Sequence, residues 1–139
     1  MNGTVFIDTA GWLALINRKD QLHAQAVDVY RSLGKVSRIT TDAILVETCN
    51  ALSKPSFRHL AVALIEKVRE AEQLRVLRVA HVTKYLLEQA WELFRERPDK
   101  EWSLTDCISF IVMRRHRCSR AFTSDRHFEQ AGFKCLLQS

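Results

Sequence analysis

The sequence predicts one α/β domain over residues 1–139, a three-layer α/β/α sandwich with a central parallel sheet of about five strands. Two observations predict this class. Short, β-prone apolar runs alternate with longer amphipathic segments along the whole chain. The length of 139 residues is that of a single domain. Parallel strands need crossover connections, and the intervening helices supply them.

The first half of the chain predicts strands and helices in alternation. Val5–Ile7 is an apolar run that stops at Asp8 and Thr9, a pair suited to capping the next helix. Apolar residues at helical spacing predict a helix over 22–33, which the glycine after it would end. The elements expected next are a strand over 38–40, helices over 42–52 and 58–72, a strand over 74–79 and a helix over 82–95.

The last third of the chain begins with a helix-start signal. Ser103-Leu104-Thr105-Asp106 matches a capping box before an apolar helix over 107–116. The remaining elements expected are a strand over 121–123, a helix over 125–131 and a last strand over 133–137.

Composition excludes several classes of protein. Hydrophobic residues make up 47% and charged residues 27%, which is typical of a globular domain. No apolar run approaches the roughly 18 residues of a membrane span, and the early Asp8 argues against a signal peptide. We therefore expect no membrane association and a cytoplasmic protein. The net charge of +5 weakly favours a polyanionic partner, and the four cysteines, none of them in a C-x-x-C pair, are expected to be reduced thiols.

Four acidic residues, Asp8, Glu47, Asp106 and Asp125, are candidates for a functional site. Ligands bind open α/β sheets beyond the carboxyl ends of the strands, where Asp8 and Asp125 fall. Asp106 begins the helix before the fourth strand. Two helices separate the third and fourth strands, so the sequence does not decide at which edge of the sheet Asp106 lies. Each acid also has a structural interpretation, as a helix cap or a solvent-facing residue.

Four segments of the sequence resemble the acidic motifs of the PIN domain. They are Phe6-Ile7-Asp8-Thr9, Val46-Glu47-Thr48-Cys49-Asn50-Ala51-Leu52, Trp102-Ser103-Leu104-Thr105-Asp106-Cys107, and Thr123-Ser124-Asp125-Arg126-His127-Phe128 with Gly132-Phe133. The motifs occur in order over the whole chain, and the short length resembles the toxin ribonucleases called VapC. The resemblance implies a PIN-like sheet with the four acids gathered in one pocket.

Four carboxylates in one pocket imply a bound cation. Without one they repel each other and raise each other's pKa. Carboxylate donors without Cys or His favour Mg²⁺ or Mn²⁺ over zinc. We expect Asp8, Asp106 and Asp125 to bind the metal and Glu47 to orient its water. The predicted reaction is metal-assisted hydrolysis of RNA phosphodiester bonds that leaves a 5′-phosphate and a 3′-hydroxyl.

Other chemistries fit the sequence less well. A histidine-driven ribonuclease is disfavoured by the scatter of the five histidines, and the spacing of His116, Cys118 and His127 fits no common zinc pattern. Asp99 is interpreted as a loop residue rather than a further acid of the site. The hydroxyls of Thr9 and Ser124 are candidates for holding carboxylates, though a structural role is favoured.

The basic residues divide into two groups. Arg114, Arg115 and Arg117, with Arg120 nearby, follow the helix that Asp106 begins, and about 15 Å of helix separates them from that acid. We interpret them as complementing the helix C-terminus rather than as an RNA surface. The candidates for holding substrate phosphates are Arg126, Lys100, Arg18 and Lys19. The three tryptophans, although able to stack on bases, are expected in the core or at an interface.

The resemblance also implies partners. A toxin of this kind has an antitoxin, whose Arg or Lys would lie among the four acids in place of the metal, and it forms a homodimer. Two alternatives remain open: a PIN nuclease of RNA maturation or decay without an antitoxin, and a non-catalytic module that binds RNA or protein.

Overall fold

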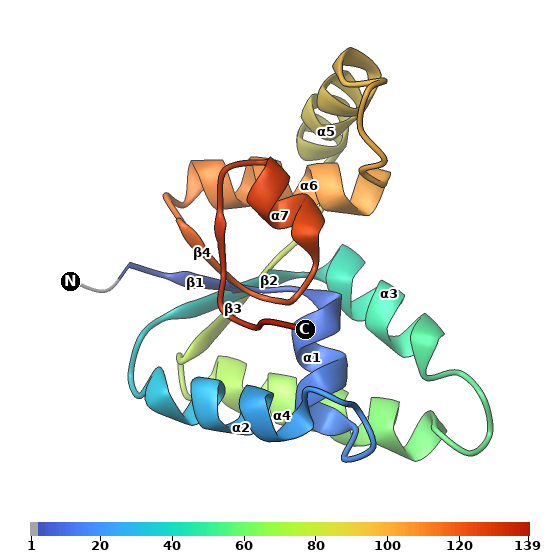
Figure 1. The fold of residues 1–139 in the computed structure, drawn as a ribbon, viewed down its shortest axis with the longest axis vertical. Helices are drawn as coiled ribbons and strands as arrows, with labels where there is room; N and C mark the ends of the chain where they lie inside the picture. The colour runs from blue at the N-terminus through green and yellow to red at the C-terminus, as the bar shows by residue number, and fades with distance from the viewer. Residues whose placement is uncertain (1–2) are drawn as a thin grey trace.

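The computed structural model describes residues 3–139 and contains one five-stranded, all-parallel sheet with the order β3-β2-β1-β4-β5 (Figure 1). The strands are β1 (Val5–Ile7), β2 (Arg38–Thr41), β3 (Leu77–Ala80), β4 (Arg120–Phe122) and β5 (Lys134–Cys135). The helices are α1 (Thr9–Ile16), α2 (His23–Ser32), α3 (Asp42–Ala51), α4 (Arg58–Gln73), α5 (Lys84–Glu96), α6 (Leu104–Arg115) and α7 (Arg126–Gln130). The predicted α/β/α class is confirmed.

The strand order reverses beside β1. The chain runs outward from β1 to β2 and β3, then returns to the other side of β1 for β4 and β5. The register pairs Ile7 with Phe122, so the carboxyl ends of β1 and β4 lie side by side. Such a reversal point is where open α/β sheets bind ligands.

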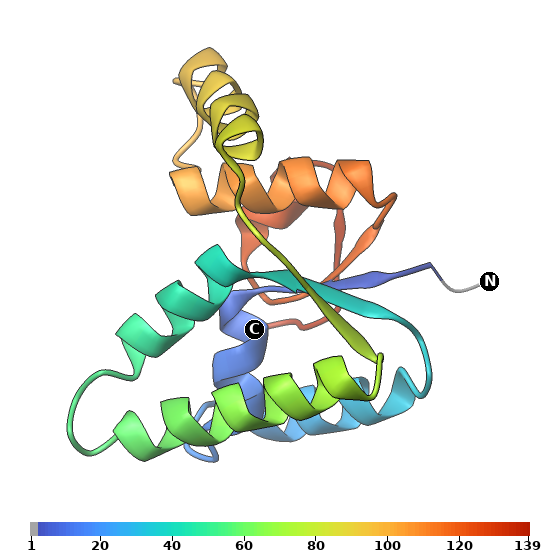
Figure 2. The ribbon, with the colours of Figure 1, turned by 180° about the vertical axis from the view of Figure 1, so that it is seen from behind.

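Helices cover both faces of the sheet. Helices α1, α2 and α4 lie on one face and α6 and α7 on the other (Figures 1 and 2). Helix α5 packs against α6 and projects away from the sheet, so it does not run back along the strands. Because α5 projects in this way, the following loop returns to the carboxyl edge and α6 begins there.

An aromatic cluster fixes the layer formed by α6 and α7. Phe110 of α6 and Phe128 of α7 meet edge to face with their ring centroids 5.0 Å apart, and Phe128 lies 6.2 Å from Phe6 of β1. All three rings are fully buried. Burial of each such side chain contributes about 2–3 kcal/mol. The cluster therefore packs α6 and α7 against each other and against the sheet.

Gly11 allows α1 to approach the end of β4. A Cβ atom at this position would lie 2.1 Å from the carbonyl oxygen of Phe122. The backbone N–H of Asp8 donates to the same oxygen over 3.3 Å. The absence of a side chain at residue 11 thus brings Asp8 against the segment that follows β4.

Several element boundaries differ from the prediction. The strand predicted over 74–79 begins only at Leu77, because α4 continues to Gln73 and Arg75 turns the chain with φ of +59°. Helix α6 begins three residues earlier than predicted, directly after its cap Ser103. Strand β4 ends one residue early and β5 is shorter than the predicted 133–137.

The cysteine thiols are unpaired. All four cysteines are free, and burial raises the pKa of the Cys107, Cys118 and Cys135 thiols to about 11. Within residues 3–139, no helix combines the length and apolar character that crossing a membrane requires.

Candidate active site

Asp8 lies at the point where β1 gives way to α1. It occupies the N-cap position of α1, but its carboxylate forms no capping hydrogen bond. Instead, the hydroxyl of Thr123 donates to its Oδ2 over 2.8 Å. Burial raises the pKa of Asp8 to about 7; the hydrogen bond from Thr123 opposes this, and the nearby charges of Asp106 and Asp125 add to it. Helix capping, the structural interpretation of Asp8, therefore does not explain why a carboxylate is buried at this position.

Asp106 forms the capping box that its sequence predicts. Its backbone N–H donates to Ser103 Oγ over 2.9 Å, and the Ser103 N–H donates to its Oδ2 over 3.1 Å. Burial raises the pKa of Asp106 and the charge of Asp125 adds to the rise, while hydrogen bonds from Ser103 and His127 lower it. The carboxylate thus both caps α6 and lies close enough to Asp125 to be repelled by it.

His127 lies between two of the acids, a placement that sequence reasoning missed. Its Nδ1 is 2.9 Å from Asp106 Oδ2 and 3.5 Å from Asp125 Oδ1. Asp125 caps α7 by accepting the His127 backbone N–H over 2.9 Å. One ligand atom from each of Asp106, Asp125 and His127 falls within 4.8 Å of the others. Sequence analysis assigned no histidine to the site; His127 lies there because the first turn of α7 folds residue 127 back over its own cap.

Glu47 reaches the site from α3. The hydroxyl of Thr9, at the start of α1, donates to its carboxylate. Thr9 thus holds a carboxylate, although the sequence favoured a structural role for it. The hydroxyl that holds Asp8 belongs to Thr123. Both hydrogen bonds fix carboxylates that the helix positions alone would leave free to rotate.

The four predicted acids line one pocket of about 350 Å³ at the carboxyl edge of the sheet. Its lining consists of Asp8, Thr9, Ala10, Leu13, Glu47, Glu101, Ser103, Asp106, Asp125 and His127. Glu101 is an addition to the predicted set. Asp99 does not line the pocket and accepts two hydrogen bonds from Arg97 instead, of 3.0 and 2.9 Å.

The pocket has the electrostatics of a cation site. Five carboxylates line it, and its lining contains no Lys or Arg. None of the four cations suggested by the sequence for phosphate binding lines it: Lys100 lines a neighbouring hollow, and Arg18 and Lys19 line another. The raised pKa values of Asp8 and Asp106 are the expected result of crowding carboxylates in a buried place. The carboxylate oxygens of this pocket are the kind of donor that suits Mg²⁺ or Mn²⁺.

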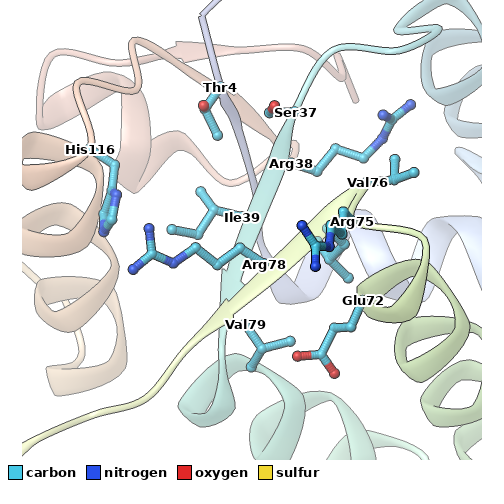
Figure 3. Close-up of a pocket in the computed structure, with 11 residues that line it drawn as sticks. Thr4, Ser37, Arg38, Ile39, Glu72, Arg75, Val76, Arg78, Val79 and His116 are labelled. Carbon is cyan, nitrogen blue, oxygen red and sulfur yellow. The ribbon is translucent and has the colours of Figure 1, made fainter.

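A second hollow, of about 440 Å³, lies at the opposite edge of the sheet (Figure 3). Thr4, Ser37 and Val76, which directly precede three of the strands, line it. The side chains of Arg78 and His116 approach each other there (Figure 3). Burial lowers the pKa of His116, and the charges of Arg78 and Arg115 lower it further. This edge carries none of the four acids.

Comparison with known proteins places this geometry in a family. Residues 5–134 match the PIN domain. The chain belongs to the PIN domain family. It is 36% identical over 132 residues to the 23S rRNA-specific endonuclease VapC20 of Mycobacterium tuberculosis. The aligned residues cover 93% of this chain and 95% of that protein.

Comparison with solved structures agrees with the assignment of this chain to the PIN domain family. The crystal structure of M. tuberculosis VapC20, described as a toxin that cleaves the sarcin-ricin loop, matches with a TM-score of 0.82 and 35% identity, over 93% of this chain and 95% of that one. VapBC2 of Rickettsia felis, bound to a DNA fragment from its promoter, matches with a TM-score of 0.65 over 95% of this chain and 96% of that one. At 11% identity the second match shows the fold alone.

Proposed function

We propose that this PIN domain is a metal-dependent endoribonuclease that acts as the toxin of a toxin-antitoxin pair. The observation that carries the proposal is the single pocket lined by Asp8, Glu47, Asp106 and Asp125, in a chain 36% identical to an rRNA endonuclease along nearly its whole length. Its proposed location is the cytoplasm, where rRNA is found.

The proposed metal ligands are Asp8, Asp106 and Asp125. The support is that all three line one pocket at the reversal point of the sheet, where Thr123 and Ser103 orient two of the carboxylates. A bound Mg²⁺ or Mn²⁺ would polarise the scissile phosphate and lower the pKa of the attacking water. His127 holds Asp106 through Nδ1, which leaves the second oxygen of that carboxylate free for binding.

Glu47 and its partner Thr9 complete the proposed chemistry. The Thr9 hydroxyl fixes one carboxylate oxygen of Glu47, so the other is free to accept a hydrogen bond from the attacking water and direct it in line with the leaving oxygen. Attack at phosphorus breaks the P–O3′ bond. The phosphate stays on the 5′ end of the downstream fragment, and the upstream fragment keeps a 3′-hydroxyl.

The proposed substrate is structured RNA, with the sarcin-ricin loop of 23S rRNA as the first sequence to test, since a relative that covers nearly the whole chain cleaves it. The proposed partners are an antitoxin and a second copy of the chain. An antitoxin Arg or Lys among the acids would replace the metal charge and form charge-assisted hydrogen bonds.

Expression in a bacterial host tests this proposal. Wild-type chain is expected to arrest growth and leave new 5′-phosphate ends in 23S rRNA, and the Asp106→Asn variant is expected to do neither. Co-expression with the protein of the neighbouring reading frame should relieve the arrest and yield a complex. RNA cleavage without growth arrest or partner would instead favour the nuclease of RNA maturation.

A further inference from the structure

A further hollow, of about 470 Å³, lies beside the acidic pocket and is distinct from the one at the opposite edge of the sheet. We call it the aromatic hollow; it is lined by Trp91, Phe94, Arg95, Arg97, Pro98, Lys100, Glu101, Trp102 and Cys107. Glu101 lines both hollows. The wall between them is the segment over 100–107, which starts α6. The two hollows are therefore neighbours on the surface, and a chain-like ligand can reach both.

Two exposed aromatic rings form one side of this hollow. Trp91 and Phe94 of α5 stack with their centroids 5.6 Å apart and their planes 19° from parallel. Their exposed fractions are 48% and 38%. On the same helix Leu86 and Ala90 are buried, so the two rings stand out as aromatic surface that the rest of the described chain leaves partly uncovered.

The deeper side of the hollow is rigid. Trp102 is buried, its Nε1 donates to Gln130 Oε1 over 3.0 Å, and its ring meets Phe110 edge to face at 5.0 Å. These contacts hold the hollow in shape without a ligand. A planar ligand would thus meet a preformed site, with little ordering needed on binding.

The rim of the aromatic hollow is basic, in contrast to the pocket beside it. Arg97 lies over the Trp102 ring at 5.1 Å and Lys100 Nζ at 6.0 Å. Arg97 already pairs with Asp99, but Lys100 forms no ion pair with any residue of the described part of the chain. An aromatic surface beside an unpaired cation is typical of sites where single-stranded nucleic acid stacks.

We propose that the aromatic hollow binds an unpaired base of the RNA substrate, next to the phosphate cleaved in the acidic pocket. Trp91 stacks on the base and Lys100 contacts its phosphate. The proposal rests on the proposed ribonuclease function and assigns it a recognition subsite. Charge complementarity and continuity with the acidic pocket favour RNA over a second protein chain as the occupant.

Kinetics of a stem-loop RNA that carries the sarcin-ricin sequence test the proposal. Trp91→Ala should raise KM about tenfold and leave kcat within about twofold, because stacking is lost but the metal site is intact. Trp91→Phe should restore most of the loss. The matched control is Tyr85→Ala, on the same helix and 67% exposed but under Arg115 rather than in the hollow; it should leave KM unchanged.

Fluorescence gives a readout that does not depend on cleavage. Trp91 is half exposed, whereas Trp12 and Trp102 are 3% and 4% exposed, so quenching by added RNA reports mainly on Trp91. We expect quenching in the inactive Asp8→Asn variant. Lys100→Gln should reduce the slope of log Kd against log salt concentration by about 0.7, the value for one phosphate contact on a single strand.

The outcomes separate the two proposals. If the wild type cleaves RNA but Trp91→Ala has the wild-type KM and RNA causes no quenching, the subsite is wrong and the ribonuclease stands. If Trp91→Ala instead breaks a dimer in sedimentation, and regains the wild-type KM at concentrations where it is dimeric, the hollow is a protein interface. RNA quenching in a chain that cleaves no RNA supports the subsite and overturns the proposed enzyme.

Discussion

The Thr123 hydroxyl donates a 2.8 Å hydrogen bond to Asp8 Oδ2 and joins residues that are 115 positions apart in the sequence. The bond lies at the reversal point of the sheet, directly after β1 and β4. It favours the ionised form of a carboxylate whose burial favours the neutral form. Thr123 is itself fully buried. This hydrogen bond therefore partly offsets the rise in pKa that burial causes in the most buried acid of the site.

Thr123→Val should weaken metal binding. Removal of the hydroxyl takes away the hydrogen bond that lowers the Asp8 pKa, so more of the carboxyl group is protonated at pH 7. We expect a several-fold loss of Mn²⁺ affinity at pH 7 that shrinks at pH 8.5, measured by titration calorimetry. Ser124→Ala serves as the control for a neighbouring hydroxyl and should bind as the wild type does; equal losses in both variants would argue against a specific role for Thr123.

The stability of the metal-free protein should fall as pH rises from 5 to 8. The pKa of Asp8 is about 7 in the folded chain and near 3.8 when unfolded, so the folded state binds the proton more tightly. Asp8 therefore stabilises the fold at low pH, and this contribution, about 2–3 kcal/mol, is lost as pH passes through 7. Urea unfolding in EDTA measures it. Asp8→Asn should lack this part of the pH dependence, and identical profiles for both proteins would contradict the raised pKa.

Replacement of His127 should reduce metal affinity without unfolding the protein. His127 Nδ1 contacts Asp106 at 2.9 Å, and loss of a partner that orients a metal ligand typically costs 10–100-fold in affinity. The measurement is the rise of Tm with added Mn²⁺, which should need correspondingly more metal in His127→Ala. His116→Ala, at the opposite edge of the sheet, is the control and should respond as the wild type does.

The arginines at the end of α6 should affect stability rather than RNA binding. Arg115 lies over the Tyr85 ring at 5.3 Å and donates to Gln89, so it ties α6 to α5. Replacing Arg114, Arg115 and Arg117 with Gln should cost at most about 1 kcal/mol each and leave the salt dependence of RNA binding unchanged. A smaller salt slope in the triple variant would place these cations on the RNA path.

Gly11→Ala should be strongly destabilising. The new Cβ would meet the Phe122 carbonyl oxygen at 2.1 Å, and backbone atoms cannot move aside as a flexible side chain can. We expect a loss of about 3 kcal/mol or more in the free energy of unfolding. Gly34→Ala is an informative comparison, because nothing crowds its Cβ and only its φ of +56° is unfavourable; its loss should be clearly smaller.

The sequence predicted the fold class and the order of elements because hydrophobic periodicity and caps are local signals. The box of Ser103 and Asp106 and the cap at Asp125 are both present. The start of β3 was misplaced because the chain turns at Arg75 with a positive φ. A glycine is the usual sequence signal for such a turn, and none is present there. Periodicity alone could not place Asp106 at the acidic edge, since that depends on α5 projecting away from the sheet.

The candidate site was predicted in part for the same reason. Asp8, Asp106 and Asp125 lie at the starts of helices, where local capping signals mark them in the sequence. Glu47 lies inside α3 and was indicated by the resemblance to the PIN domain. All four acids line one pocket. His127 and Glu101 also line this pocket, but only the three-dimensional course of the chain brings them there. His127 is folded back by the cap of α7, and Glu101 lies on the returning loop before α6. Only the spacing of Asp125 and His127, two residues apart at a helix start, hints at this from the sequence.

Cleavage of a sarcin-ricin stem-loop RNA by purified wild-type and Asp106→Asn protein, with EDTA and then with added Mn²⁺ or Mg²⁺, tests the central claim most directly. Asn keeps an oxygen that can accept the Ser103 N–H, so α6 should stay capped. The account predicts cleavage to a 5′-phosphate by the wild type only when metal is present, and a loss of at least about 1,000-fold in the variant. Equal cleavage by both proteins, or full activity in EDTA, would contradict it.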